Sequence, residues 1–326
     1  MPNKQNMWKF KPILKTTIWG GDRIIPFKGL DIALSDVGES WEISGVPGSE
    51  SVVESGPDAG MTLSDLIDKY DARLLGERNL EKFGRNFPLL IKFINSRHDL
   101  SVQVHPDDEL AAMRGYPFGK NEMWYIVETG KDARIASGFT SAVDPDDYDR
   151  LVESGNFKNV LRYFNVHPGE VYFIPAGRVH AICGNCLLME VQQTSDVTYR
   201  IYDYKRKDKN GKERELHTEL AREAINFADT GGKAVDYRQL ANIPVNVIRS
   251  PFFCVNVLDV DTSLMRDYSE SDTFVILICT AGQADISCGQ ETVRLTAGHT
   301  LLIPASATGI GINPSKNVSL IETYIQ

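Results

Sequence analysis

The sequence lacks both a long hydrophobic run and an excess of basic residues. In 326 residues no apolar stretch approaches the roughly 20 residues that cross a bilayer. The N-terminal segment MPNKQNMWKFKPIL has neither an apolar stretch like that of a signal peptide nor a small-residue cleavage site. Lys and Arg number 35 against 44 Asp and Glu, a net charge of -9, whereas nucleic-acid scaffolds need a basic face. We therefore expect a cytoplasmic protein that binds neither membrane nor nucleic acid.

Cysteine is also scarce, with five residues in the chain. An odd number in a long chain fits reduced thiols better than a disulfide framework. Cys183 and Cys186 form one CxxC motif, but no second pair follows at the spacing of a zinc ribbon. We interpret these two cysteines as ordinary residues of a loop near the functional site.

The sequence does contain many short runs in which apolar and polar residues alternate. Examples are SVQVHP, MWYIVE, TYRIYDY and FFCVNVLDV, separated by clusters of Pro, Gly, Asp and Asn. This pattern is typical of an all-β sandwich or barrel. Helical spacing is limited to residues 61–84, with Thr62 or Ser64 as the N-cap, and to residues 144–153 and 217–227.

An internal repeat indicates a duplicated architecture. HPGEVYFIPAGRVH, residues 167–180, aligns with TAGHTLLIPASATG, residues 296–309, at a constant spacing of 129 residues. Gly309 stands in the second copy where the first has His180. The length of the chain favours two domains, and a Gly- and Pro-containing polar stretch at residues 230–245 suggests their boundary.

Four potential metal ligands occur in three of the predicted strand segments. Gln103 and His105 are two residues apart in LSVQVHPDDE, so on a strand both side chains project from one face. Glu122 of KNEMWY and His180 of GRVHAI supply a carboxylate and a second imidazole. Four convergent nitrogen and oxygen donors suit zinc and its first-row neighbours. The alternative is a cluster of buried polar side chains that only pair with one another.

Six motifs together resemble the type I mannose-6-phosphate isomerase family, in particular its shorter bacterial branch. They are TIWGG, GESWEIS, LSVQVHPDD, GKNEMWY, PAGRVHAI and QQTSDVTYR, and the resemblance extends from about residue 8 to residue 326. It implies a mainly β fold of two cupin-type jelly-roll units with helical insertions. Residues 1–240 would form the catalytic domain and residues 241–326 a metal-free domain. The implied metal is one Zn²⁺ per chain, with other divalent first-row ions possible, held by Gln103, His105, Glu122 and His180.

The resemblance also implies a reaction and further site residues. The family interconverts mannose 6-phosphate and fructose 6-phosphate through an enediol, which needs proton transfer, oxyanion stabilisation and cations for the phosphate. Arg200 matches the family's active-site arginine, and Ser101 and Lys120 match its phosphate-binding residues. Lys92, in the apolar run LLIKFINS, matches a catalytic lysine, and burial is expected to lower its pKa for proton transfer.

Each of these assignments has a structural alternative. Arg200 could be a surface arginine paired with Asp203 or Asp196, and Lys120 could be merely solvated. Lys92 could pair with a nearby carboxylate such as Glu42 of GESWEIS.

Other residues suggest the shape of the pocket and the limits of the resemblance. Glu42, Trp41 and Trp19 are expected to line the pocket, although a core position explains both tryptophans equally well. Gly119 stands where longer family members carry a histidine, so no role of that histidine transfers to this chain.

Two other functions remain open on the sequence. The first is a non-enzymatic cupin regulator that binds a sugar phosphate without turnover, because a fold does not determine function. The second is a metal-dependent cupin oxygenase or epimerase, which the donor set fits less well because oxygenases usually have histidine-rich iron sites. We expect a monomer or a homodimer.

Overall fold

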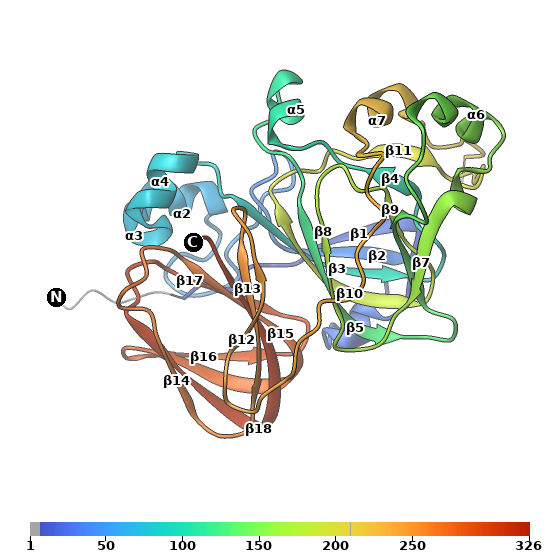
Figure 1. Cartoon of the computed structure of the whole chain (residues 1–326). Helices are drawn as coiled ribbons and strands as arrows, with labels where there is room; N and C mark the ends of the chain where they lie inside the picture. Colours follow the sequence, from blue (N-terminus) through green and yellow to red (C-terminus); the bar gives the residue numbers. More distant parts are fainter. Residues whose placement is uncertain (1–6, 209) are drawn as a thin grey trace.

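The computed structural model describes residues 7–208 and 210–326, and residues 1–6 of the N-terminal segment considered above lie outside it. Over these ranges the chain is mainly β, with three antiparallel sheets (Figure 1). The first sheet has the strand order β1 (Ile13–Gly21), β2 (Val37–Ile43), β3 (Leu89–Ser96), β10 (Cys186–Gln193), β5 (Glu122–Thr129) and β8 (Val171–Ile174). The second has the order β11 (Tyr199–Tyr202), β4 (Val102–Val104), β9 (His180–Ile182), β6 (Arg134–Phe139) and β7 (Leu161–Asn165).

The third sheet is built from the C-terminal part of the chain. It contains β12 (Val245–Arg249), β13 (Cys254–Val260), β14 (Leu264–Asp267), β15 (Val275–Cys288), β16 (Glu291–Thr296), β17 (Thr300–Ile303) and β18 (Gly309–Tyr324). The predicted repeat has a structural counterpart: β8 and β17 occupy equivalent positions, and His180 and Gly309 each begin a strand. The proposed division at residue 240 stays a prediction, and the start of the chain also contacts the third sheet, because the Trp8 N–H donates to the Leu302 carbonyl at 3.0 Å.

One hydrophobic core, which we call the shared core, joins the first and third sheets. Phe87, Ile91 and Phe93 from the N-terminal part pack in the same cluster as Phe253 and Phe274 from the third sheet. The ring centroids of Phe87 and Phe274 are 4.7 Å apart. The two halves of the chain therefore bury apolar surface against each other, which stabilises both.

Helices surround the sheets and are short. α2 (Leu63–Tyr70) begins at Thr62, whose hydroxyl and the Asp65 carboxylate form a capping box, as the sequence predicts. The helical pattern of residues 61–84 is interrupted, however, giving α3 (Ala72–Leu75) and α4 (Glu77–Phe83). The remaining helices are α1 (Ile24–Phe27), α5 (Asp108–Met113), α6 (Tyr148–Glu153) and α7 (Thr218–Ala224), with 3₁₀ turns at Pro145–Asp147 and Phe157–Val160. α6 and α7 confirm the two other predicted helices, and no helix in the described ranges is both long and apolar enough to cross a membrane.

The segment that connects the second and third sheets, residues 225–244, we call the strap. It has neither helix nor strand, yet it is anchored along the N-terminal part. The Phe139 N–H donates to the Asp229 carbonyl at 3.0 Å and the Val235 N–H to the Val171 carbonyl at 2.8 Å. Arg178 also pairs with the Asp229 carboxylate at 2.8 Å. The strap is therefore a fixed part of the fold.

Candidate metal centre and substrate cavity

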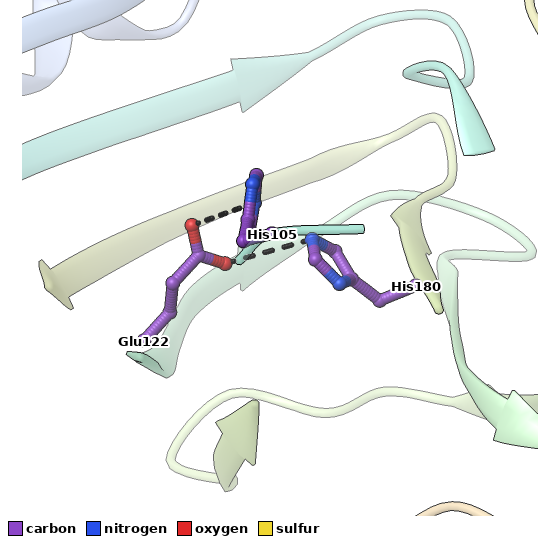
Figure 2. Close-up of side chains that lie close together, drawn as sticks. All are labelled: His105, Glu122 and His180. Atoms are coloured by element: carbon purple, nitrogen blue, oxygen red, sulfur yellow. Dashed lines mark ion pairs between the residues drawn. The ribbon is translucent and has the colours of Figure 1, made fainter. Parts of the chain in front are cut away.

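Three predicted metal ligands converge in the interior of the N-terminal part (Figure 2). Glu122 begins β5, His180 begins β9 and His105 directly follows β4. His105 Nε2 lies 3.2 Å from Glu122 Oε1, and His180 Nε2 lies 3.6 Å from Glu122 Oε2. All three side chains are only 1% exposed. We call this group the His–Glu–His cluster.

Gln103, the fourth predicted ligand, lies beside this cluster. It pairs directly with His180 across β4 and β9, and its Nε2 is 3.3 Å from His180 Nε2. The Ser101 hydroxyl donates to Gln103 Oε1 at 3.2 Å. Val102 and Val104, which alternate with these residues, are buried in an apolar cluster. The predicted alternation of polar and apolar side chains along this strand is therefore present.

The charges of the cluster follow from its burial. Burial, followed by the positive charge of Lys120, lowers the pKa of His105 to about 3. Burial likewise lowers the pKa of His180, whose Nδ1 lies 2.9 Å from the Arg178 carbonyl. Burial would raise the pKa of Glu122, but Lys120 and His105 outweigh it and hold that pKa well below its usual value. The cluster thus consists of two neutral imidazoles and one ionised carboxylate.

This arrangement fits a bound cation. Because His180 Nδ1 donates to the Arg178 carbonyl, its Nε2 presents a lone pair toward the carboxylate of Glu122. Within the described residues, Glu122 Oε2 accepts no hydrogen bond despite its burial. A buried acceptor without a donor costs about 1–3 kcal/mol, and a cation between the ring nitrogens and the carboxylate removes that cost. Imidazole and carboxylate together are ligands typical of zinc and its neighbours.

A cavity of about 140 Å³ opens beside the cluster. The residues predicted for catalysis and phosphate binding, Lys92, Ser101, Lys120 and Arg200, all line it together with Gln103 and Glu122. Trp19, Trp41 and Trp124 supply apolar walls, so the two tryptophans predicted to line the pocket do so. These side chains include residues from five of the six motifs, which therefore meet at one cavity.

Lys92 is buried, but its environment differs from the expected one in two respects. Its Nζ lies 3.4 Å from Glu190 Oε1 and 3.9 Å from Glu39 Oε2, while Glu42 instead pairs with Lys28 at 2.8 Å. The alternative of a lysine paired with a nearby carboxylate is therefore present, with Glu190 and Glu39 as partners. Glu42, the suggested partner, neither pairs with Lys92 nor lines the cavity as predicted, because it projects from the opposite face of β2 to Glu39. Burial alone would lower the pKa of Lys92, but the carboxylates of Glu190 and Glu39 raise it. The expectation of a lowered pKa is also wrong, and the ammonium stays charged.

Glu190 is a site residue that the sequence interpretation missed. It lies on β10 and is 3% exposed, and Trp124 Nε1 donates to its Oε2 at 2.8 Å. Burial and the nearby charge of Glu122 raise its pKa to about 7. The signal was available, because Glu190 is a charged residue in the apolar run LLMEVQQ, just as Lys92 is in LLIKFINS.

Two further cations of the cavity, Lys120 and Arg200, are also held by defined contacts. Lys120 is 4% exposed and lies 3.1 Å from Glu122 Oε1, so it is not a solvated surface lysine. Arg200 Nη1 donates to the Glu215 carbonyl at 2.8 Å. Asp203, one of the two alternative partners of Arg200, instead pairs with Arg206 and Arg214.

The structure explains the glycine at position 119. A Cβ atom on Gly119 would lie 2.5 Å from the Asp107 carbonyl carbon, and its N–H donates to Asp108 Oδ1 at 2.7 Å. No side chain, histidine included, fits there unless the start of α5 moves.

Cys183 directly follows β9, and Cys186 is the first residue of β10 rather than a loop residue, because it pairs with Ser96 of β3; both are buried free thiols. Burial raises the pKa of Cys183 to about 12 and that of Cys186 to about 11. Both thiols therefore stay protonated and unreactive at neutral pH.

Comparison with known proteins places the chain in a family. Residues 7–148 match the phosphomannose isomerase type I catalytic domain, and residues 243–324 match the mannose-6-phosphate isomerase cupin domain. The chain is 35% identical over 298 residues to mannose-6-phosphate isomerase ManA of Bacillus subtilis, which covers 90% of this chain and 92% of that protein. The chain belongs to the type I phosphomannose isomerase family.

Two further comparisons with mannose-6-phosphate isomerases extend along nearly the whole chain. The mannose-6-phosphate isomerase of Streptococcus mutans is 32% identical over 292 residues, covering 88% of this chain and 89% of that one. The crystal structure of the mannose 6-phosphate isomerase from Bacillus subtilis matches with a TM-score of 0.88 and 30% identity, covering 98% of this chain and 100% of that chain. The predicted mainly β, cupin-type fold and the predicted family are therefore confirmed.

Proposed function

We propose that the protein interconverts mannose 6-phosphate and fructose 6-phosphate as a metal-dependent aldose–ketose isomerase. The observation that carries this proposal is the buried His–Glu–His cluster beside a cavity with two lysines and two arginines, in a chain of this family. The alternative, a regulator that binds a sugar phosphate without turnover, has no supporting feature of its own in the structure.

We assign the metal to Gln103, His105, Glu122 and His180, with Zn²⁺ as the first candidate. The donor set supports this assignment, because imidazole and carboxylate are common zinc ligands, and the same donors accept other divalent first-row ions. The bound ion would supply Lewis-acid polarisation of the sugar's oxygens.

The cavity's own residues suit the remaining requirements of the reaction. Arg200 is a permanent cation and would stabilise negative charge on the bound substrate. Lys92 is held charged by Glu190 and Glu39, so we assign it a cationic or proton-donating role rather than that of a base. Trp19, Trp41 and Trp124 would exclude bulk water from the enediol.

Ser101 and Lys120 are proposed to contact the phosphate group. Both line the cavity, and the Ser101 hydroxyl can donate to a phosphate oxygen. Because Lys120 already pairs with Glu122, its charge is partly neutralised in the structure. It would therefore contribute less than a free lysine to binding a dianion.

A coupled assay that detects fructose 6-phosphate formed from mannose 6-phosphate tests the activity. We expect turnover that a chelator abolishes and Zn²⁺ restores, with one equivalent of metal by elemental analysis. Glu122→Gln should lose both metal and activity, whereas His299→Gln, a histidine of the third sheet, should keep both. Ligand binding without any turnover in metal-replete protein would favour the regulator instead.

A further inference from the structure

We propose that Arg214 is a further substrate-binding residue, which forms with Arg200 a pair of guanidinium groups that holds the phosphate of the sugar. This inference rests on the proposed function. Arg214 lies outside every motif that resembles the family, but it lines the same cavity as Arg200 and the His–Glu–His cluster.

The position of the Arg214 side chain is fixed by Asp203. Its Nε donates to Asp203 Oδ2 at 2.7 Å and its Nη2 to Asp203 Oδ1 at 2.6 Å. Asp203 is only 4% exposed and also accepts a hydrogen bond from Arg206 at 2.5 Å. A two-point contact of this kind holds the planar guanidinium in one orientation. Within the described ranges Arg214 Nη1 has no protein acceptor, so its two N–H groups are available to a ligand.

The distribution of charge around the cavity favours this position for an anion. Lys92 pairs with Glu190, and Lys120 pairs with Glu122, so both lysines are matched by buried carboxylates. Arg200 and Arg214 also line the cavity, where Asp203 holds Arg214 and the carboxylates of Asp203 and Glu215 act on Arg200. Neither guanidinium is therefore matched by Glu122 or Glu190, the buried carboxylates that pair with the two lysines.

Arg200 and Arg214 are also close enough to influence each other. Burial lowers the pKa of Arg200, and the positive charge of Arg214 lowers it further. Two adjacent guanidinium groups repel each other unless an anion lies between them. A phosphate dianion carries negative charge, and a guanidinium group can donate two parallel hydrogen bonds to a pair of its oxygens. The sugar phosphate that this enzyme is proposed to bind supplies such a group.

Steady-state kinetics of three variants test the proposal. Arg214→Gln should raise KM for mannose 6-phosphate, and the inhibition constant of inorganic phosphate, by about 10- to 100-fold with a smaller change in kcat. Arg214→Lys keeps the positive charge but loses the planar guanidinium that donates two parallel hydrogen bonds, and we expect an intermediate KM. Arg206→Gln is the matched control, because Arg206 shares Asp203 but does not line this cavity. Its KM should stay within about threefold of the wild type.

A binding measurement separates this inference from the proposed function. Calorimetric titration with inorganic phosphate reports binding whether or not the protein turns over substrate. Thermal unfolding of each variant shows whether it is folded. If Arg214→Gln is not folded, the phosphate affinity of Arg214→Lys is compared with that of the wild type instead. Unchanged phosphate affinity in folded Arg214→Gln, or an equal loss in Arg206→Gln, would overturn the role of Arg214 even in an active enzyme. An inactive wild type that binds phosphate through Arg214 would overturn only the proposed isomerase activity.

Discussion

Lys92 and Glu190 face each other directly across two neighbouring strands of the first sheet, β3 and β10. Both are buried, and their Nζ and Oε1 atoms are 3.4 Å apart. Removing one member of a buried ion pair leaves the other charged and without compensation, whereas replacing both can be nearly neutral. The pair therefore matters for stability as well as for the chemistry of the cavity.

We expect Lys92→Met to lower the free energy of unfolding by about 3–5 kcal/mol, because Glu190 and Glu39 then lose their buried cation. The double variant Lys92→Met with Glu190→Gln should recover a substantial part of this loss. Urea denaturation of the two single variants and the double variant gives the coupling between the residues. Additive losses would mean that the two side chains do not stabilise each other.

The thiols provide a second test at the scale of single residues. All five cysteines are buried, and burial raises the pKa of Cys183, Cys186 and Cys279 to about 11–12. A thiol reagent such as Ellman's reagent at pH 8 should therefore react slowly with the native protein and fully with the denatured protein. Fast reaction of even one thiol in the native state would contradict the burial described here.

At the scale of residues, the sequence predicts which side chains share a face when they alternate along one strand. Ser101, Gln103 and His105 share a face because they are two residues apart. Predicting the partners of Lys92 requires knowing that β3 pairs with β2 and β10, which the local sequence does not encode. Glu39 and Glu42 both occur in GESWEIS, and since they are three residues apart only one of them can face the cavity. Arg214 lies beyond the last motif, so nothing local marked it.

At the scale of elements, the segment after β11 is held in place by Asp203. Burial would raise the pKa of Asp203, but hydrogen bonds from Arg214 and Arg206 outweigh it and lower that pKa. A carboxyl with a lowered pKa stabilises the folded protein above the pKa of the unfolded chain, about 4. That contribution is lost as the pH falls through the lower pKa of the folded state.

We therefore expect Asp203→Asn to lower the free energy of unfolding at pH 7 by about 1.5–3 kcal/mol. The difference from the wild type should shrink as the pH falls below 4. Asp149→Asn is the control, because the Asp149–Arg222 pair is exposed and should contribute less than about 1 kcal/mol. Chemical denaturation at a series of pH values gives both differences, and a constant difference across the range would contradict the assigned role.

Helices show where element prediction from sequence ends. Thr62 and the first turn of α2 follow from a local capping box, and the sequence predicted them. The breaks after α2 and α3 occur at Asp71 and Gly76, which have φ angles of 51° and 91°. A Cβ on Gly76 would lie 2.3 Å from the carbonyl oxygen of Asp272, which lies between β14 and β15. The second break therefore depends on a contact with a residue far along the chain.

At the scale of the whole molecule, the third sheet has an interior unlike that of the part that contains the His–Glu–His cluster. Glu322, which is fully buried, accepts hydrogen bonds from Arg266, Tyr268 and Asn256 at 2.6–3.0 Å. Gly309 occupies the position that corresponds to His180. The repeat predicted the loss of the ligand, but the polar network that occupies this interior was not apparent from the sequence.

The shared core makes the two parts of the chain interdependent. We expect a single cooperative transition in calorimetry of the full chain, with equal calorimetric and van't Hoff enthalpies. A fragment of residues 1–240 would expose the face that packs on Phe253 and Phe274, and should be aggregation-prone or poorly folded. A stable, monomeric fragment with native circular dichroism would show instead that the predicted division at residue 240 separates autonomous domains.

The anchored strap has a kinetic consequence. A linker rich in Gly and polar residues suggests a hinge, yet the strap forms an ion pair with Arg178. Arg178 lies two residues before His180, and its carbonyl accepts a hydrogen bond from the His180 ring. Swinging the C-terminal part away would pull on the loop that positions an imidazole of the metal centre. Substrate entry and product release should then need no movement of the C-terminal part, so added glycerol should slow turnover only to the extent that it slows free diffusion.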